Sequence, residues 1–580
     1  MKKELYLGNE AVARGLYEAG CRVVSSYPGT PSTEITQYAA EYAEIYAEWA
    51  PNEKVAAEVA IGASIGGARA FSGMKHVGLN VAADPVFTAS YTGVNAGLVI
   101  AVADDPGMHS SQNEQDSRHY AISAKLPMLE PADSAECLAF TKLAFELSEQ
   151  FDTPCLLRLT TRVSHSRSLA EPGERAELPL KEYVKNPGKY VMMPAMAKIR
   201  HPIVEQRMLD LAEWAEAAEI NRIEANPDTK IGVITSGIAY QYAREALGDT
   251  VSYLKLGMIH PLPAELIKNF AKDYETVYVI EELDGIIETF CMTLGLKVTG
   301  KALFGNVGEF SANLVREKIL DRKPEGQPFG QPTPPRPPVL CPGCPHRGLF
   351  YVASKLKLTV MGDIGCYTLG ALPPLSAMDV CVCMGASVSA CHGINLARGK
   401  DFAKNTVAVI GDSTFIHSGI TGLIDIAYNK GVSTVIVLDN SITGMTGHQH
   451  NPTTGYTLKN DPTVAVDLEL LAKACGINRV AVVDPNDLAA TEAVIKQELA
   501  AEEPSMIITR RPCALLKTVR HAPPATVDQT ACTGCKMCMK VGCPSISMKT
   551  VDGKNKAAID PTLCVGCMVC AQMCRFGAIT

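Results

Sequence analysis

The chain is poor in several features that mark common functional classes. Aromatic side chains make up 6% of its 580 residues, so the sequence offers no obvious stacking pocket. The formal net charge is -8, which leaves no basic footprint for nucleic acid. No uninterrupted apolar run reaches the roughly 18 residues that suggest a membrane span. The opening MKKELYLGNEAVARGL lacks the apolar segment of a secretory signal, so we expect a cytoplasmic protein.

Cysteine, by contrast, is abundant, with 20 residues. Without an export signal, metal ligation explains them better than disulfides do. Eight of them form two runs near the end of the chain, Cys532-x2-Cys535-x2-Cys538-x4-Cys543 and Cys564-x2-Cys567-x2-Cys570-x3-Cys574. Exposed iron–sulfur sites are oxidised by air, so we expect an anaerobic or microaerobic host.

The spacing of the two runs predicts two [4Fe–4S] clusters. Three thiolates of one run hold a cluster, and the fourth cysteine ligates the other cluster. The predicted sets are Cys532, Cys535, Cys538 and Cys574 for cluster 1, and Cys564, Cys567, Cys570 and Cys543 for cluster 2. Zinc is the alternative, but two CxxC pairs would leave the third cysteine of each run unused. The first run has one residue more before its last cysteine than the usual bacterial pattern, and Arg575 stands where proline usually follows the second run.

The rest of the chain alternates apolar strands with helical stretches, which predicts α/β domains with mostly parallel sheets. In the first part, strands are predicted in CRVVSSYPG, KHVGLNVAAD, GLVIAVADD and TPCLLRLT. A helix is predicted around MLDLAEWAEAAEINRIEAN. Further strands are predicted in KIGVITSG, SYLKLG, TVYVIEE, TVAVIGD and STVIVLDN. A proline-rich stretch between the second and third α/β units cannot form a central strand or a helix, which indicates a linker.

Two of the predicted strands end in residues suited to a diphosphate and a magnesium ion. Gly411-Asp412-Ser413 follows one strand, and Asn440 follows another. Open α/β sheets bind ligands at these carboxyl ends. Asp412, the amide oxygen of Asn440 and the backbone carbonyl of Ile442 are oxygen ligands of the kind that Mg²⁺ prefers. The alternative is two ordinary turns, because a glycine and an aspartate at a strand end are common.

These motifs resemble the diphosphate-binding signature of thiamine diphosphate enzymes, and other segments make the resemblance more specific. SYPGTPSTE (26–34) resembles the pyrimidine-domain signature of 2-oxoacid:ferredoxin oxidoreductases. The segments ADDPG (103–107) and CPGCPHR (341–347), together with the lengthened first cysteine run, are similar to one branch, the arylpyruvate (indolepyruvate) oxidoreductase alpha subunits.

The resemblance implies a multidomain α/β architecture that covers nearly the whole chain. The expected parts are a pyrimidine-binding domain (1–185), a transketolase-C-like domain (186–323), a proline-rich linker (324–340), a diphosphate and magnesium domain (341–520), and a ferredoxin-like domain with two [4Fe–4S] clusters (521–580).

The resemblance also assigns candidate roles to single residues. Glu53 is expected to contact N1′ of the aminopyrimidine and activate the cofactor, with Glu58 as the rival carboxylate. Thr30 is expected to contact thiamine or substrate. His448, in the loop after Asn440, is expected near the cofactor, although a structural role is as compatible with the sequence. Arg118 is a candidate for binding the substrate carboxylate.

Four further cysteines match a proximal cluster found in related oxidoreductases. They are Cys341 and Cys344, Cys366 in the DIGCY turn beside Gly365, and Cys513. The alternative is a turn or a conditional metal site beside buried thiols. Cys381, Cys383 and Cys391 match no motif, and we expect them to be buried core residues.

The implied activity is oxidative decarboxylation of aryl 2-oxoacids with coenzyme A, with electrons passing to ferredoxin. The expected cofactors are thiamine diphosphate, Mg²⁺, and two or three [4Fe–4S] clusters. The expected partner is a small beta subunit, within a dimer of alpha–beta heterodimers. One alternative is a non-oxidative thiamine decarboxylase or synthase with an appended ferredoxin domain. A second is an electron-transfer subunit with inactive α/β domains, which the retained Glu53, Asp412 and Asn440 disfavour.

Overall fold

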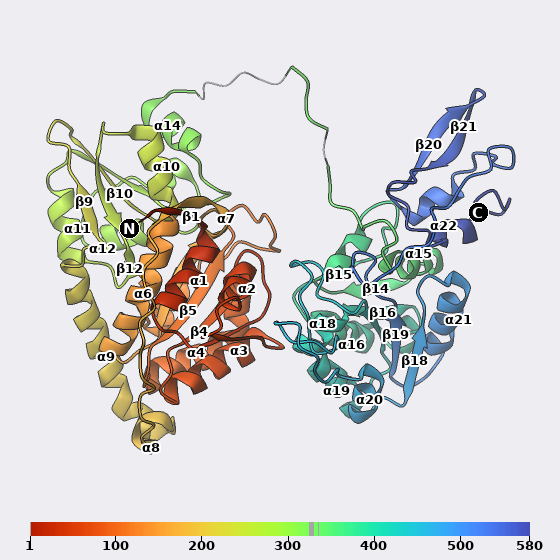
Figure 1. The fold of residues 1–580 in the computed structure, drawn as a ribbon, viewed down its shortest axis with the longest axis horizontal. Helices are drawn as coiled ribbons and strands as arrows, with labels where there is room; N and C mark the ends of the chain where they lie inside the picture. Colours follow the sequence, from red (N-terminus) through yellow and green to blue (C-terminus); the bar gives the residue numbers. More distant parts are fainter. Residues whose placement is uncertain (1, 324–329, 335) are drawn as a thin grey trace. The chain divides into compact units, whose positions relative to one another are not determined.

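The computed structural model describes residues 2–323, 330–334 and 336–580. The chain forms two compact units, unit 1 (residues 1–330) and unit 2 (residues 331–580). Both contain parallel sheets covered by helices (Figure 1), which confirms the predicted α/β class. Of the predicted linker, residues 324–329 and 335 lie outside the described residues, and the remainder of 324–340 contains no helix or strand. In the described part of the chain, no helix is long and apolar enough to cross a membrane.

Unit 1 is built on a seven-stranded sheet whose neighbouring strands are parallel except at one edge, where β12 is antiparallel to β6. In spatial order the strands are β12 (Met258–His260), β6 (Met128–Leu129), β7 (Cys155–Thr160), β5 (Leu98–Asp104), β4 (Ala70–Lys75), β2 (Val23–Ser26) and β3 (Tyr46–Trp49). All seven residues of β5 are buried, as expected for a central parallel strand. Helices α1 (Gly8–Glu18), α2 (Thr33–Ala39), α3 (Glu53–Ile65) and α6 (Ser134–Gln150) pack beside it (Figure 1).

One predicted strand in unit 1 is wrong. KHVGLNVAAD contributes only its first residue to β4, and the rest belongs to helix α4 (His76–Thr92). A short apolar run fits a buried strand or a buried helix equally well, so its periodicity cannot decide between them. The preceding segment already fills the strand position, and α4 packs its buried side against α3.

A second sheet in unit 1 has four strands in the order β13 (Thr276–Ile280), β10 (Ile231–Ser236), β11 (Ser252–Leu256) and β9 (Arg222–Glu224), with β9 antiparallel. The predicted helix before it is confirmed in its first part, because α9 covers Pro194–Glu216. The last residues of that prediction instead form β9. A two-stranded antiparallel sheet, β1 (Glu4–Leu7) with β8 (Arg167–Ala170), completes unit 1.

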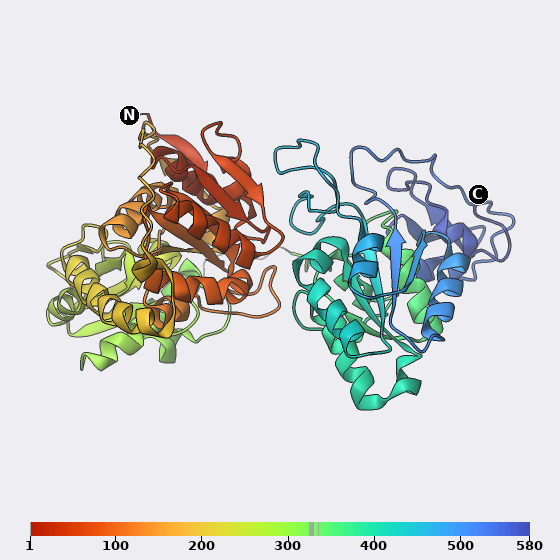
Figure 2. The same ribbon diagram turned by 90° about the horizontal axis from the view of Figure 1, so that it is seen from below.

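Unit 2 contains a six-stranded, all-parallel sheet in the order β15 (Val380–Cys381), β14 (Thr359–Gly362), β16 (Thr406–Gly411), β17 (Thr434–Asp439), β19 (Ser505–Arg510) and β18 (Arg479–Val483). Alternate residues of a strand point to opposite faces. On β16, Val407 and Val409 pack with α15 (His346–Leu356) and α21 (Leu488–Leu499), whereas Ala408 and Ile410 pack with α16 (Ala386–Arg398) and α19 (Ile420–Tyr428). Helices therefore cover both faces (Figure 2), which explains the continuous apolar strands.

The cysteine-rich tail belongs to unit 2. It contains η3 (Met537–Val541), the antiparallel hairpin of β20 (Ile546–Val551) and β21 (Lys554–Ile559), and α22 (Val569–Gln572) (Figure 1). Val541, Val569 and Met573 join the hydrophobic cluster beneath α15 and α21. The Gln572 side chain also donates to the carbonyl of Asn486, at 2.7 Å. The tail is thus packed against the domain that carries the Asp412 motif.

Candidate functional site

The first candidate site lies at the carboxyl edge of the sheet in unit 2. β16 and β17 are parallel neighbours, so Asp412, directly after β16, and Asn440, directly after β17, emerge at the same edge. Both are buried. The hydroxyl of Thr453 donates to Asp412 Oδ2 at 3.2 Å, so the loop after β17 folds back over this carboxyl. At Gly411, an added Cβ would lie 2.6 Å from the ring of Tyr367, which explains glycine there.

Burial, reinforced by the negative charge of Asp439, raises the pKa of Asp412 to about 7. A bound divalent cation would offset this cost of burying a carboxylate. The oxygens predicted to hold Mg²⁺ come from adjacent positions, because the backbone N–H of Ile442 donates to Asn440 Oδ1 at 3.3 Å. Ser413 is buried beside Asp412. A buried carboxyl, an amide oxygen and a close-approach glycine therefore fit a cation with a diphosphate.

The four cysteines of the predicted proximal set come together at this same edge. Cys366 follows β14 and Cys513 follows β19, while Cys341 and Cys344 precede α15. The thiols of Cys341 and Cys513 contribute to raising the pKa of Cys366, after burial, to about 11, and Cys344 interacts with Cys341 and Cys366. Because a thiol must lose its proton to bind a metal, iron binding would overcome these raised pKa values.

This cysteine group adjoins the Asp412 site directly. The backbone N–H of Cys513 donates to the carbonyl of Asn440 at 2.9 Å. A Cβ at Gly444 would lie 3.4 Å from Cys366 Sγ. His448 Nε2 lies 4.0 Å from Cys513 Sγ. The structure therefore brings His448 to the proximal cysteines, where a role beside the cluster is as open to it as one beside thiamine.

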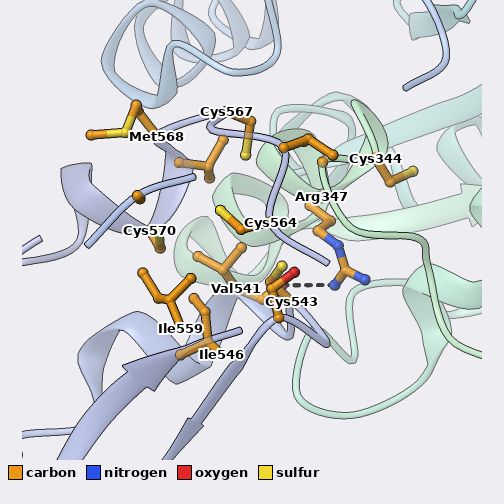
Figure 3. Close-up of a pocket in the computed structure, with 15 residues that line it drawn as sticks. Cys344, Arg347, Val541, Cys543, Ile546, Ile559, Cys564, Cys567, Met568 and Cys570 are labelled. Atoms are coloured by element: carbon orange, nitrogen blue, oxygen red, sulfur yellow. Dashed lines mark hydrogen bonds between the residues drawn. The ribbon is translucent and has the colours of Figure 1, made fainter. Parts of the chain in front are cut away.

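The tail forms two separate pockets that sort its eight cysteines. One is lined by Cys532, Cys535, Cys538 and Cys574, and the other by Cys543, Cys564, Cys567 and Cys570 (Figure 3). In each pocket, three cysteines come from one run and the fourth from the other run. This arrangement fits the crosswise ligation of two four-iron clusters.

Backbone groups point at the sulfurs of the first of these pockets. The N–H of Ala557 donates to Cys532 Sγ at 3.4 Å, and the N–H of Ala578 donates to Cys574 Sγ at 3.3 Å. Such hydrogen bonds stabilise thiolates and tune the potential of a bound cluster. Within the described ranges, no group of three His, Cys, Asp or Glu residues is suited to a metal ion, and all twenty cysteines are free thiols.

Unit 1 contains the second group of predicted residues. Glu53 begins α3, behind Asn52, whose side chain accepts from the N–H of Val55 at 2.9 Å. Its side chain is 4% exposed and packs against Gly78 of α4, where an added Cβ would lie 2.6 Å from Glu53 Oε1. Glu58 is exposed and ion-paired with Lys54. The structure thus separates the two rivals and leaves Glu53 as the buried carboxylate.

Thr30 lies in the loop after β2, where it is partly buried. Its carbonyl accepts from the hydroxyl of Ser110 at 3.4 Å, which joins this loop to the loop after β5. Lys75, which sequence reasoning missed, ends β4 between them and donates to the carbonyl of Ser110 at 2.7 Å. Burial lowers the pKa of Lys75 to about 8. A lysine that ends a fully apolar strand at the ligand-binding edge was the available signal.

Two sequence-based expectations are wrong. Arg118 is fully buried, and its guanidinium forms ion pairs with Asp116 at 2.6 Å and Glu281 at 2.5 Å, so it is not available to a substrate. Cys381 and Cys383 are exposed rather than buried, because β15 is an edge strand, whereas Cys391 is buried as expected.

Comparison with known proteins gives matches along the chain. Residues 14–225 match the model of the pyruvate flavodoxin/ferredoxin oxidoreductase thiamine diphosphate-binding domain, residues 363–509 that of the C-terminal TPP-binding domain of thiamine pyrophosphate enzymes, and residues 557–580 that of the 4Fe–4S binding domain. These matches confirm the predicted thiamine and ferredoxin-like fold classes.

Full-length relatives are named as subunits of a single enzyme. The indolepyruvate oxidoreductase subunit IorA of Archaeoglobus fulgidus is 39% identical, over 94% of this chain and 97% of its own. The subunits of the same name from Pyrococcus horikoshii and Thermococcus kodakarensis are 40% and 41% identical, each over 94% of this chain and 92% of the relative.

Proposed function

This chain belongs to the family of the indolepyruvate oxidoreductase subunits IorA, and we propose from that premise that it oxidatively decarboxylates aryl 2-oxoacids. At the coarser level the assignment is plain: it is an oxidoreductase subunit of the thiamine-dependent 2-oxoacid:ferredoxin type with an iron–sulfur domain. The aryl preference and coenzyme A as acyl acceptor are the proposed part. The printed substrate of the relatives, indolepyruvate, supports the former.

Thiamine diphosphate, when bound, supplies the electron sink for decarboxylation. Asp412, Asn440 and the carbonyl of Ile442 would hold Mg²⁺ against the diphosphate, next to Gly411 and Ser413. Glu53 would hold a proton shared with N1′ of the aminopyrimidine, and its burial supports that role. Thr30, on the loop after β2, would contact thiamine or the substrate.

The observation that carries the proposal is the continuity of cysteine sites within unit 2. The proximal cysteines adjoin the Asp412 edge through Cys513 and Gly444. Cys344, a member of this set, also lines the tail pocket of Cys543, Cys564, Cys567 and Cys570. A proximal cluster and two tail clusters would thus form a path from the thiamine site to the protein's surface, where ferredoxin accepts electrons. The cluster nearest ferredoxin would be the one at Cys535, which is exposed.

The partner and the compartment are also proposals. A small beta subunit would complete the active site, as the word subunit in the relatives' names suggests, in a dimer of alpha–beta heterodimers. The free thiols fit a reducing compartment, so we place the chain in the cytoplasm. The competing function, a non-oxidative thiamine decarboxylase, gives no role to the cysteine pockets that line the proposed path.

The test is anaerobic turnover of the chain purified with its small subunit. Viologen reduction and carbon dioxide release are measured with indolepyruvate or pyruvate, with and without coenzyme A. We expect coenzyme A-dependent reduction that favours indolepyruvate. Carbon dioxide release with aldehyde and no viologen reduction would establish the decarboxylase instead, and a preference for pyruvate would remove the aryl assignment.

A matched pair of variants separates the two halves of the reaction. Glu53→Gln should stop both carbon dioxide release and viologen reduction. Cys564→Ser, in the tail, should slow viologen reduction far more than a single turnover of decarboxylation. Equal loss of both activities in Cys564→Ser would contradict the proposed electron path.

A further inference from the structure

Arg347 occupies an unusual position between the diphosphate domain and the cysteine tail. It is the second residue of α15 and is 4% exposed. Its guanidinium donates to backbone carbonyls of two segments that are far apart in sequence. Nε donates to Cys341 at 3.1 Å, Nη1 donates to Val541 at 3.1 Å and to Gly542, and Nη2 donates to Leu340. One side chain therefore fastens the Cys341 turn to the loop before Cys543 (Figure 3).

The loop that receives Arg347 is the lengthened part of the first cysteine run. Residues 539–542 separate Cys538 from Cys543, one residue more than in the usual bacterial spacing. Val541 and Gly542 lie in this insertion and provide two of the acceptors. Gly542 has φ +69°, and a Cβ there would lie 2.8 Å from Pro374 and 3.3 Å from Arg347 Nη1. The longer spacing thus forms a receptor for the guanidinium.

The same guanidinium lines the pocket of Cys543, Cys564, Cys567 and Cys570. It interacts electrostatically with Cys543 and Cys567 there, and with Cys341 and Cys344 of the proximal set. In the described part of the chain, no carboxylate forms an ion pair with Arg347. A buried cation without a carboxylate partner acts strongly on nearby charge, because little solvent screens it.

We propose that Arg347 is a positioning residue that anchors this tail pocket to the Cys341 turn and raises the reduction potential of the cluster bound there. Reduction adds one electron to the cluster, forms no new bond and increases its negative charge by one. The adjacent guanidinium stabilises that reduced state. The cluster beside Cys344 thereby becomes the better electron acceptor of the two tail clusters. This inference rests on the proposed assignment of Cys543, Cys564, Cys567 and Cys570 as ligands.

The test compares Arg347→Gln, Arg347→Lys and Lys355→Gln in the intact protein purified anaerobically with its partner. Lys355 lies on the same helix but is exposed and paired with Glu492, so it controls for loss of a positive charge. Iron and sulfide are quantified, and the clusters are titrated with dithionite under EPR. In Arg347→Gln we expect at least a tenfold lower equilibrium constant for reducing one tail cluster, which is about 59 mV for one electron. Lys355→Gln should match the wild type.

The outcomes separate this inference from the proposed cluster sites. Wild-type protein without two tail cluster signals would overturn the site assignment itself. Arg347→Gln with full iron content and unchanged potentials would overturn the role of Arg347 while leaving the sites intact. If Arg347→Gln loses a cluster, Arg347→Lys decides. Retention of the cluster and its potential with lysine supports the charge, and loss with lysine too overturns it.

Discussion

At the scale of single residues, burial separates residues that the sequence leaves equivalent. Glu53 and Glu58 lie in one short segment, yet one is packed against Gly78 and the other is ion-paired at the surface. Position on the helix explains the difference, because residues five apart in an α-helix point in directions well apart. A carboxylate with a proton-transfer role needs the enclosed position.

We expect Glu53→Gln to lower thiamine-dependent turnover by about a hundredfold or more, the usual contribution of a positioned acid or base. The isosteric amide keeps the packing against Gly78, so the melting temperature should change little. Viologen reduction under saturating thiamine diphosphate provides the measurement. Glu58→Gln is the matched control and should retain activity. Equal activity loss in both variants would contradict the assignment of Glu53.

The crosswise cysteine sets give a second prediction at residue scale. Cys532→Ser/Cys574→Ser removes two ligands of one pocket, and Cys564→Ser/Cys574→Ser removes one ligand from each pocket. We expect the first pair to lose one cluster and the second pair to disturb both. Iron analysis and EPR after anaerobic purification distinguish them. If the pair from different runs disturbed both clusters and the pair from one run spared one, ligation would follow the runs instead.

At the scale of elements, the contact between α3 and α4 holds Glu53 in place. Gly78 permits the approach, since any β-carbon would overlap the Glu53 carboxylate. We expect Gly78→Ala to displace that carboxylate and to cost roughly 1–3 kcal/mol of stability, typical of overpacking. Thermal unfolding measures the stability, and viologen reduction measures the displacement.

Gly62 on α3 provides the matched glycine. An added Cβ there would meet nothing within 4 Å, and the residue is exposed. We expect Gly62→Ala to stabilise the protein by about 0.5–1 kcal/mol through its helix preference. A stabilising Gly78→Ala would show that the two helices can separate at little cost and would contradict the packing argument.

At the scale of the whole molecule, each compact unit has its own hydrophobic cores, and the cysteine tail belongs to one of them. Calorimetry of the chain should therefore resolve two unfolding transitions. Removing iron anaerobically should lower only one of them by several degrees, because bound clusters stabilise only the unit that ligates them. Gly78→Ala should lower the other transition. A single transition that moves with both changes would mean that the units unfold together.

Much of this molecule followed from sequence because its signals are local. A run of cysteines or an apolar strand ending in Gly411-Asp412 carries its chemistry within a few residues, and so the fold class and the predicted strands β5, β7, β16 and β17 could be anticipated. The segment after β4 could not, since a short apolar run does not distinguish a strand from a buried helix.

What only the tertiary structure decided depends on contacts between distant segments. Arg118 looked available to a substrate but is neutralised by Asp116 and Glu281, 163 residues away in the latter case. Arg347 reaches the carbonyls of Val541 and Gly542, and Cys513 reaches Asn440. Sequence alone determined which ligands and strand ends exist, because those are local chemistry. Burial, charge pairing and the approach of one loop to another arise only when the chain packs, and these decided which residues can act.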